Sequence, residues 1–452
     1  MVDVTLHAIY GIKKQTLVFS RWPHQAEIIP PAHSGQVHSE RQRGMTQEQT
    51  YTNPDAESLK GRFGRDIFND FDIDDPKFNE HFFDALDEMV TKCPVVRSNV
   101  GNGYWLVTRQ EDVRKVGQDW RTFSSAKGYM PNRPEGLPYL MPEESDPPKH
   151  TAWRKVLNPH LSPVAIAKYE DRIRADVNVL IDRFIDKGEC EFISEFGAKL
   201  PGWAFFKNVL GVPVDDLDML VEGVENGTFA PPEERAGHMA KVFDYLGKYL
   251  EIRKNEPPRG DMVDVIAAGV EYEDGQLAPW EDRVSILVDL TFGGIATTTY
   301  VMAGAIHHLA THQNDRETLV DNPDMIEQAV EEFVRVFPPV VALGRTCTRD
   351  VEVAGTQMKE GDFVLLGYST ASRDPRVVEN PRKIDISRQT VLHTAFGVGQ
   401  HRCIGSNLAR LELRATFDEW LKRIPDFGLK PGTQPSYETG ILRTMKELQL
   451  VF

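Results

Sequence analysis

The chain has 452 residues, and its 52 Lys and Arg stand against 68 Asp and Glu, which gives a net charge of −16. This acidic balance argues against nucleic acid as a partner, and no apolar run reaches the ~20 residues of a membrane span. Four cysteines lie far apart without metal-ligand spacing, as in proteins of a reducing compartment that lack disulfides. We therefore expect a soluble, cytoplasmic monomer that forms one large unit.

The first part of the chain lacks sustained periodicity and predicts a flexible N-terminal extension over residues 1–44. Met45 is then a candidate natural start, and an ordered surface strap is the alternative. The remaining residues, 45–452, form the predicted domain. Apolar residues at helical spacing predict a helix that ends near Lys92, and residues 95–107 are typical of a hairpin around Asn102-Gly103. Thr108-Arg-Gln-Glu111 has the pattern of a capping box.

The next segment, residues 120–144, is long, irregular and rich in Gly and Pro, which favours a functional lid. His150 and Arg154 follow at a spacing of four and share a face if they lie on a helix, although a solvated charged face has the same pattern. Ser162-Pro163 predicts the start of a helix that runs to Gly188. Two further helices are predicted at 214–225 and 233–253.

Residues 279–312 are the longest helix-compatible run and are apolar on nearly every side, which predicts a helix through the middle of the molecule. At its centre, Gly293-Gly294 and Thr297-Thr298-Thr299 are poor helix formers. Threonine hydroxyls can bond back to the helix and bend it, so we expect a kinked groove there. Tight packing of the adjacent glycines is the alternative. Asp289, Gly293 and Thr297 recur every four residues and should share one helix face.

Glu332 and Arg335 form an i, i+3 acid–base pair, which is a common pattern by itself. Short alternating runs over 351–366 then predict strands, and residues 408–424 predict an amphipathic helix. The fold class expected from these elements is mainly α with a small β-rich region.

The most specific motif is Phe396-Gly397-x-Gly399-x-His401-x-Cys403-x-Gly405, which presents a single cysteine on a glycine-hinged loop before a helix. Glycine reaches backbone angles closed to other residues, and N–H groups at a helix start support a thiolate. A small buried hydrophobe is the alternative reading of the cysteine. The motif resembles the cysteine-ligand loop of the cytochrome P450 superfamily of haem-thiolate monooxygenases. The Gly-Gly-x-x-Thr-Thr centre and Glu332-x-x-Arg335 resemble further motifs of that superfamily, in the same order.

The resemblance implies a single large haem-thiolate fold with haem b as its cofactor and Cys403 as the iron ligand. It places the haem propionates on His150, Arg154, Arg345 and His393. The other implied cofactor-binding residues are Gly293, Gly294, Thr297, Phe396, Gly397, His401 and Gly405. Thr297 and Thr298 are the implied catalytic residues. The implied substrate-binding residues are Asp289, Phe292, Val340, Val341 and Leu343, and Arg388 is expected to lock the Glu332–Arg335 pair.

The implied reaction is insertion of one atom of O₂ into a C–H bond of a mainly apolar molecule that is terpenoid, steroid or fatty-acid-like. The chain has no nicotinamide, flavin or iron–sulfur motif, so a ferredoxin with its reductase is the expected electron source. We expect the ferredoxin to dock on Lys149, Lys155, Arg402, Arg410 and Arg414. The alternatives are a peroxide-driven enzyme, a haem isomerase, a haem sensor or carrier without turnover, and a cysteine hydrolase without haem.

The sequence departs from the superfamily pattern at Ala296, where an acid beside the threonine relays protons. A methyl group cannot carry a proton. We therefore expect either another proton route or a loss of reducing equivalents as peroxide.

Overall fold

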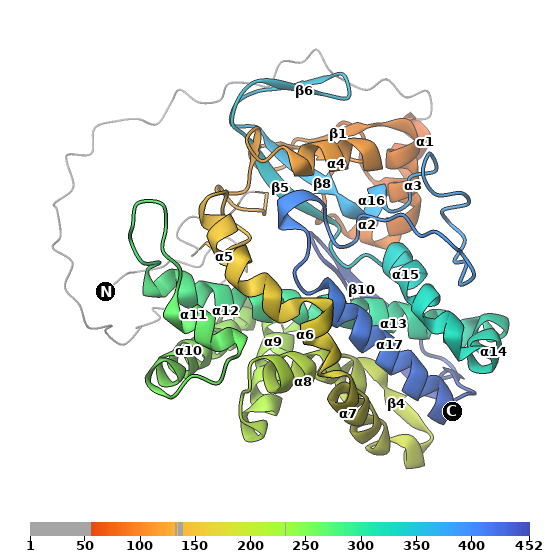
Figure 1. Ribbon diagram of the computed structural model, residues 1–452. Helices are drawn as coiled ribbons and strands as arrows, with labels where there is room; N and C mark the ends of the chain where they lie inside the picture. The colour runs from red at the N-terminus through yellow and green to blue at the C-terminus, as the bar shows by residue number, and fades with distance from the viewer. Residues whose placement is uncertain (1–55, 132, 134–138, 231) are drawn as a thin grey trace.

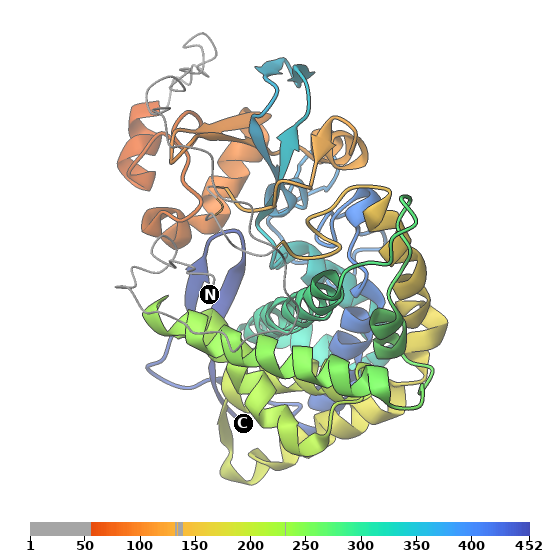
Figure 2. The same cartoon turned by 90° about the vertical axis from the view of Figure 1, so that its left-hand side faces the viewer.

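The computed structural model describes residues 56–131, 133, 139–230 and 232–452, and the predicted extension 1–44 lies outside them (Figure 1). The described chain is mainly helical with small sheets, as the sequence predicts. In Figures 1 and 2, the N-terminal helices and the largest sheet lie at the top, and α7–α10 lie at the bottom. The position of the central helix between these parts determines where a cavity can form.

The upper part contains a five-stranded sheet in the order β1-β2-β8-β5-β3. Its elements are α1 (Ala56–Phe63), α2 (Pro76–Glu80), α3 (Phe82–Lys92), β1 (Val95–Ser98), β2 (Tyr104–Val107), α4 (Gln110–Gln118), β3 (Phe123–Ser124), β5 (Ala342–Cys347), β8 (Phe363–Gly367) and α16 (Tyr368–Ala371). Phe71, Phe78 and Phe82 pack edge to face between the sheet and the first helices. The sheet therefore has its own apolar core beside the larger helical one.

The predicted hairpin is confirmed, with Val95 paired to Val107 in antiparallel register. The predicted capping box is wrong, because α4 begins only at Gln110. The Thr108 hydroxyl donates to the Cys93 carbonyl at 2.7 Å, while the Gln110 N–H donates to Asp374 at 3.0 Å. A carboxylate from a distant loop thus takes over the role that the local pattern assigns to Thr108.

The helical part consists of α5 (Lys149–Leu157), α6 (Pro163–Ala167), α7 (Glu170–Asp182), α8 (Lys199–Trp203), α9 (Leu217–Phe229), α10 (Pro232–Asn255), α11 (Met262–Ala268), α12 (Trp280–Gly294), α13 (Ala296–Thr311), α14 (Gln313–Asp321), α15 (Ile326–Val336) and α17 (Ser406–Arg423). The small strands are β4 (Glu189–Glu191), β6 (Val351–Val353), β7 (Thr356–Met358), β9 (Gly428–Leu429), β10 (Ser436–Thr439), β11 (Arg443–Glu447) and β12 (Gln449–Val451). The side chain of Ser162 caps α6, as predicted. The predicted single helix to Gly188 is wrong, since it divides into α6, α7 and a 3₁₀ turn.

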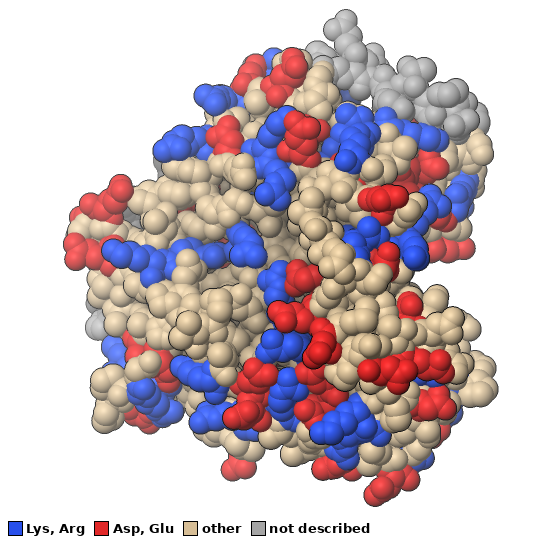
Figure 3. Space-filling view, turned by 45° about the vertical axis from the view of Figure 1, so that its right-hand side comes forward, with Lys and Arg blue, Asp and Glu red and all other residues tan. Residues whose placement is uncertain are grey.

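The central helix α12–α13 is long and apolar enough to cross a membrane by length and composition, but it is mostly buried inside this fold. A buried core helix meets the same criterion, since protein side chains surround it in place of lipid. At the surface, Lys and Arg side chains are interspersed with Asp and Glu (Figure 3). The apolar residues of α12–α13 thus pack in the protein core, and the cavity lies beside this helix.

Candidate active site

The cysteine loop is held by backbone hydrogen bonds and contains two left-handed glycines. The Cys403 N–H donates to the Phe396 carbonyl at 2.8 Å, and Gly397 and Gly399 have φ of 68° and 71°. A Cβ on Gly399 would lie 2.2 Å from the Gly117 carbonyl oxygen in α4. Glycine is required at this position both for its backbone angle and for the close approach of α4.

Cys403 faces a cavity lined by the described parts of the chain. Its residue surface is accessible from this cavity, yet burial of the thiol beneath the surrounding protein raises its pKa. The Gly405 N–H donates to the sulfur and Arg154 lies nearby, and both oppose the effect of burial. A positive group placed over the sulfur, such as a metal ion, would favour the thiolate further.

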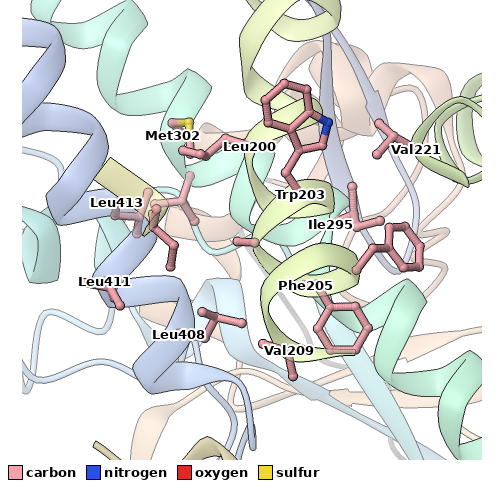
Figure 4. Close-up of a cluster of buried hydrophobic side chains, with 14 of the residues drawn as sticks. Leu200, Trp203, Phe205, Val209, Val221, Ile295, Met302, Leu408, Leu411 and Leu413 are labelled. Carbon is pink, nitrogen blue, oxygen red and sulfur yellow. The ribbon is translucent and has the colours of Figure 1, made fainter. Parts of the chain in front are cut away.

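The central helix lines the same cavity and breaks at Ile295 between α12 and α13. The Thr297 hydroxyl donates to the Gly293 carbonyl at 2.7 Å, so the predicted back-bonding is present. A Cβ on Gly293 would meet no atom within 4 Å, so the Gly293 backbone is open toward the cavity. Figure 4 shows Phe205 and Ile295 among the apolar side chains that pack beside this break.

One wall of the cavity is basic. His150, Arg154, Arg345 and His401 line it, and the rings of His150 and His401 are 4.2 Å apart. Burial and the charges of Arg154 and Arg345 lower the pKa of His150 to about 4, so the ring is neutral near neutral pH. Its Nε2 is buried without a hydrogen-bond partner among the described residues. These donors fit a flat group that carries anionic side arms, because such arms would satisfy the orphaned nitrogen and the arginine charge.

Most of the predicted site residues meet at this cavity. The predicted residues that line it are His150, Arg154, Asp289, Phe292, Gly293, Gly294, Thr297, Thr298, Val340, Leu343, Arg345, Phe396, Gly397, His401, Cys403 and Gly405.

Two predicted residues lie elsewhere in the structure. His393 is not part of the cavity wall, and its Nε2 is 3.2 Å from Glu331 Oε2. The fourth basic residue of the wall is His401. Val341 packs into the core beside the five-stranded sheet, where its N–H donates to the Ile441 carbonyl. Both differences arise from the path of the chain, which sequence spacing does not fix.

The Glu332–Arg335 pair is completely buried, with an N–O distance of 2.7 Å. Arg388 Nε lies 3.1 Å from Glu332 Oε2, where the prediction places its locking cation.

Two of the predicted docking cations are already paired. Arg410 contacts Glu331, and Arg414 Nη2 lies 3.0 Å from Glu170. Arg402, Lys149 and Lys155 are the exposed members of that predicted set.

Sequence reasoning missed two acids that line the cavity. Glu143 precedes α5 and hydrogen-bonds Asp289 of α12. Glu412 of α17 hydrogen-bonds Thr298, and burial raises the pKa of its carboxyl well above the ordinary value. Its Oε2 has no partner among the described residues. A charged residue on the apolar side of the predicted helix 408–424 was the available signal for Glu412.

Comparison with known proteins gives consistent matches. The cytochrome P450 family model matches residues 227–452. A probable cytochrome P450 of Sinorhizobium fredii is 32% identical over 74% of this chain and 80% of its own length. The steroid C26-monooxygenase of Mycolicibacterium smegmatis is 31% identical over 74% of this chain and 84% of its own length.

A solved structure shares the same overall fold. The cytochrome P450 of the Bacillus subtilis bacillaene polyketide synthase superposes with a TM-score of 0.74 at 26% identity, over 83% of this chain and 97% of the other. The likeness therefore extends over most of both chains.

Proposed function

The chain belongs to the cytochrome P450 family of haem-thiolate monooxygenases, and from this premise we propose that it oxidises a C–H bond of a mainly apolar small molecule. The observation that carries the proposal is the position of Cys403 and Thr297 on the wall of one cavity. Relatives support the substrate class, since one is a linalool 8-monooxygenase of Pseudomonas putida and another a steroid C26-monooxygenase. The proposed substrate is terpenoid, steroid or fatty-acid-like.

The proposed cofactor contacts follow from the residues of the wall. The haem supplies the activation of O₂, and Cys403 would hold its iron while His150, Arg154, Arg345 and His401 would hold its propionates. The Gly405 N–H stabilises the sulfur of Cys403 through a hydrogen bond. Phe292, Val340 and Leu343 exclude water from the substrate end of the cavity.

Thr297 and Thr298 have the role of holding water and protons at the helix break. Ala296 has no proton to offer, but Thr298 hydrogen-bonds Glu412 below it. Burial raises the pKa of Glu412 and so favours its protonated form, in which the carboxyl can donate a proton. Glu412 thus takes the place of the missing acid at position 296.

The proposal is tested by two measurements on the haem-loaded protein. Wild-type enzyme should give the thiolate-type spectrum of the reduced carbon-monoxide complex, and folded Cys403→Ser should not. Turnover should need O₂ and a ferredoxin with its reductase, and peroxide alone should support little product. Efficient turnover with peroxide alone would instead favour a peroxide-driven enzyme, and tight ligand binding without turnover would favour a sensor or carrier.

The proposed electron donor is a ferredoxin that acts in the cytoplasm, and the enzyme is proposed to be a monomer. An acidic carrier needs exposed cations near Cys403. Arg402 is exposed and precedes the cysteine, and the exposed Lys155 follows Arg154, whose Nη2 donates to the Arg402 carbonyl at 3.0 Å. Lys155→Glu and Arg402→Gln should slow reduction by the carrier and weaken its salt dependence. The control is Lys241→Glu, which changes an exposed residue of α10. This helix packs against α12 and is not part of the cysteine loop. Equal rates in all three variants would place the docking site elsewhere.

A further inference from the structure

The substrate end of the cavity contains two acids in direct contact. Glu143, from the segment before α5, and Asp289, on α12, form a hydrogen bond between their carboxyl groups. Both side chains line the cavity, where Leu140, Leu290 and Phe292 supply apolar surface. A pair of carboxyl groups is costly among apolar neighbours unless a partner satisfies its charge.

The described part of the protein supplies no such partner. No ion pair joins Glu143 or Asp289 to a Lys, Arg or His side chain among the described residues. The neighbouring Glu144 is satisfied differently, since it accepts hydrogen bonds from the N–H groups of Tyr129 and Leu140 and contacts Arg133. Arg345 acts on Glu143 only through its charge, and its Nη1 donates to the Gly344 carbonyl at 2.6 Å.

Arg345 and Arg154 also belong to the basic wall assigned to the haem propionates. Once those anions bind, the two arginines no longer neutralise the acid pair. Burial raises the pKa of both carboxyls. The charge of Glu143 and its hydrogen bond raise the pKa of Asp289 further, while the same hydrogen bond lowers the pKa of Glu143, as expected for two carboxyl groups that share one proton. The pair then carries about one uncompensated negative charge, which faces the substrate.

We propose that Glu143 and Asp289 together bind a cationic nitrogen on a substrate whose remaining surface is apolar, an inference that rests on the proposed function. A cation displaces the shared proton and contacts two carboxylates. A hydroxyl group would donate one hydrogen bond and leave the negative charge uncompensated. The proposed substrate class is therefore an apolar skeleton that carries a basic amine.

The helix geometry also predicts where such a substrate is oxidised. Asp289 lies about two turns before Thr297, which corresponds to about 12 Å in a straight helix at 1.5 Å per residue, and the break at Ile295 lies between them. A nitrogen held at Asp289 places the far end of the skeleton near Thr297. Oxidation should thus occur at a carbon remote from the nitrogen and leave the C–N bonds intact.

The test uses a matched pair of probes on the haem-loaded enzyme. Decyltrimethylammonium carries a fixed positive charge and cannot ligate iron through nitrogen. Its all-carbon isostere, with tert-butyl in place of trimethylammonium, has the same shape without charge, and decanol adds a neutral donor. Dissociation constants come from the shift of the haem absorption band and from calorimetry. Wild-type enzyme should bind the cation at least about tenfold more tightly than either neutral probe.

The variants Glu143→Gln and Asp289→Asn should each reduce that preference about tenfold while the isostere binds as before. Glu281→Gln, an exposed change in the first turn of the same helix, is the matched control. Equal wild-type affinity for the cation and the isostere would overturn the inference, as would a full preference in both pocket variants. A normal carbon-monoxide spectrum with normal turnover in such a protein would leave the proposed function intact and remove only the amine assignment.

Discussion

Glu332 and Arg335 lie three residues apart on α15, are completely buried, and are joined by hydrogen bonds of 2.7 and 2.8 Å. Arg335 also donates to the carbonyls of Ser372 and Pro381. The pair therefore ties α15 to the irregular chain that precedes the cysteine loop. Its effect on activity should be indirect, through folding.

Arg335→Leu should lower the free energy of unfolding by about 3–5 kcal/mol, because it leaves the buried Glu332 carboxylate without its main partner. Urea denaturation measures this change, and the haem content per folded protein should stay normal. The control Lys383→Met removes a side chain that is 69% exposed and should change stability by less than about 0.5 kcal/mol. Normal stability with lost turnover in Arg335→Leu would assign the pair a chemical role instead.

The close packing of the cysteine loop against α4 requires glycine at position 399. Gly399→Ala should destabilise the loop by about 2 kcal/mol or more, because the new Cβ meets the Gly117 carbonyl and φ is positive. The measurement is haem retention during dilution, which should fall. Gly237→Ala on α10 is the control, since its Cβ would meet no atom within 4 Å. Unchanged retention in Gly399→Ala would mean that α4 moves away at little cost.

Local patterns explain why much of the fold was predictable. The hairpin at Asn102-Gly103, the cap at Ser162 and the back-bonding of Thr297 depend on residues within a few positions of one another. The role of Cys403 could not be predicted from residue spacing alone, and the resemblance to family motifs supplied it. In the hairpin, the cap and the back-bonded threonine, the geometry of neighbouring residues determines the local structure.

Contacts between distant segments were not predictable in the same way. Thr108 matches a capping pattern, yet Asp374 from another loop takes its place. His393 lies ten residues before the cysteine and His401 two, and only His401 lines the cavity. The contact between Glu143 and Asp289 depends on how the segment before α5 crosses α12, and no local pattern encodes that crossing.

Glu331, which binds His393, should make a pH-dependent contribution to the free energy of unfolding. Burial opposes the charged form of Glu331, but hydrogen bonds from His393 and Arg410 outweigh it and lower its pKa to about 2 from an ordinary 4.5. A depressed carboxyl pKa stabilises the fold above the unfolded value of 4.5, and this stabilisation disappears as the pH falls toward about 2.

Glu331→Gln should therefore be less stable than wild type by about 1–2 kcal/mol near neutral pH, after allowance for solvent screening. The difference should shrink steadily below about pH 4.5. Urea denaturation of both proteins across this range measures it, with the exposed Glu327→Gln one turn earlier as the control. A difference that stays constant down to about pH 3 would contradict the assigned pKa.

The hydrogen bond between Thr298 and Glu412 predicts how protons reach the cavity. Glu412→Gln keeps the shape and the bond to Thr298 but removes the acidic proton. Product formed per electron consumed should fall severalfold, and peroxide release should rise, because general acid help is worth about 10²–10⁴-fold in rate. The control is Glu419→Gln on the same helix, which contacts Arg174 away from the cavity.

Ala296→Asp distinguishes a proton route from a structural role of Glu412. In wild type the new acid should add little, because Glu412 already supplies protons to this turn. In the Glu412→Gln background it should restore much of the lost coupling, since it returns an acidic group next to Thr297. A structural defect caused by Glu412→Gln would not respond to an acid on another helix. If coupling stays low in the double variant, the role of Glu412 is structural. If coupling is normal in Glu412→Gln alone, protons reach the cavity by a path that does not use Glu412.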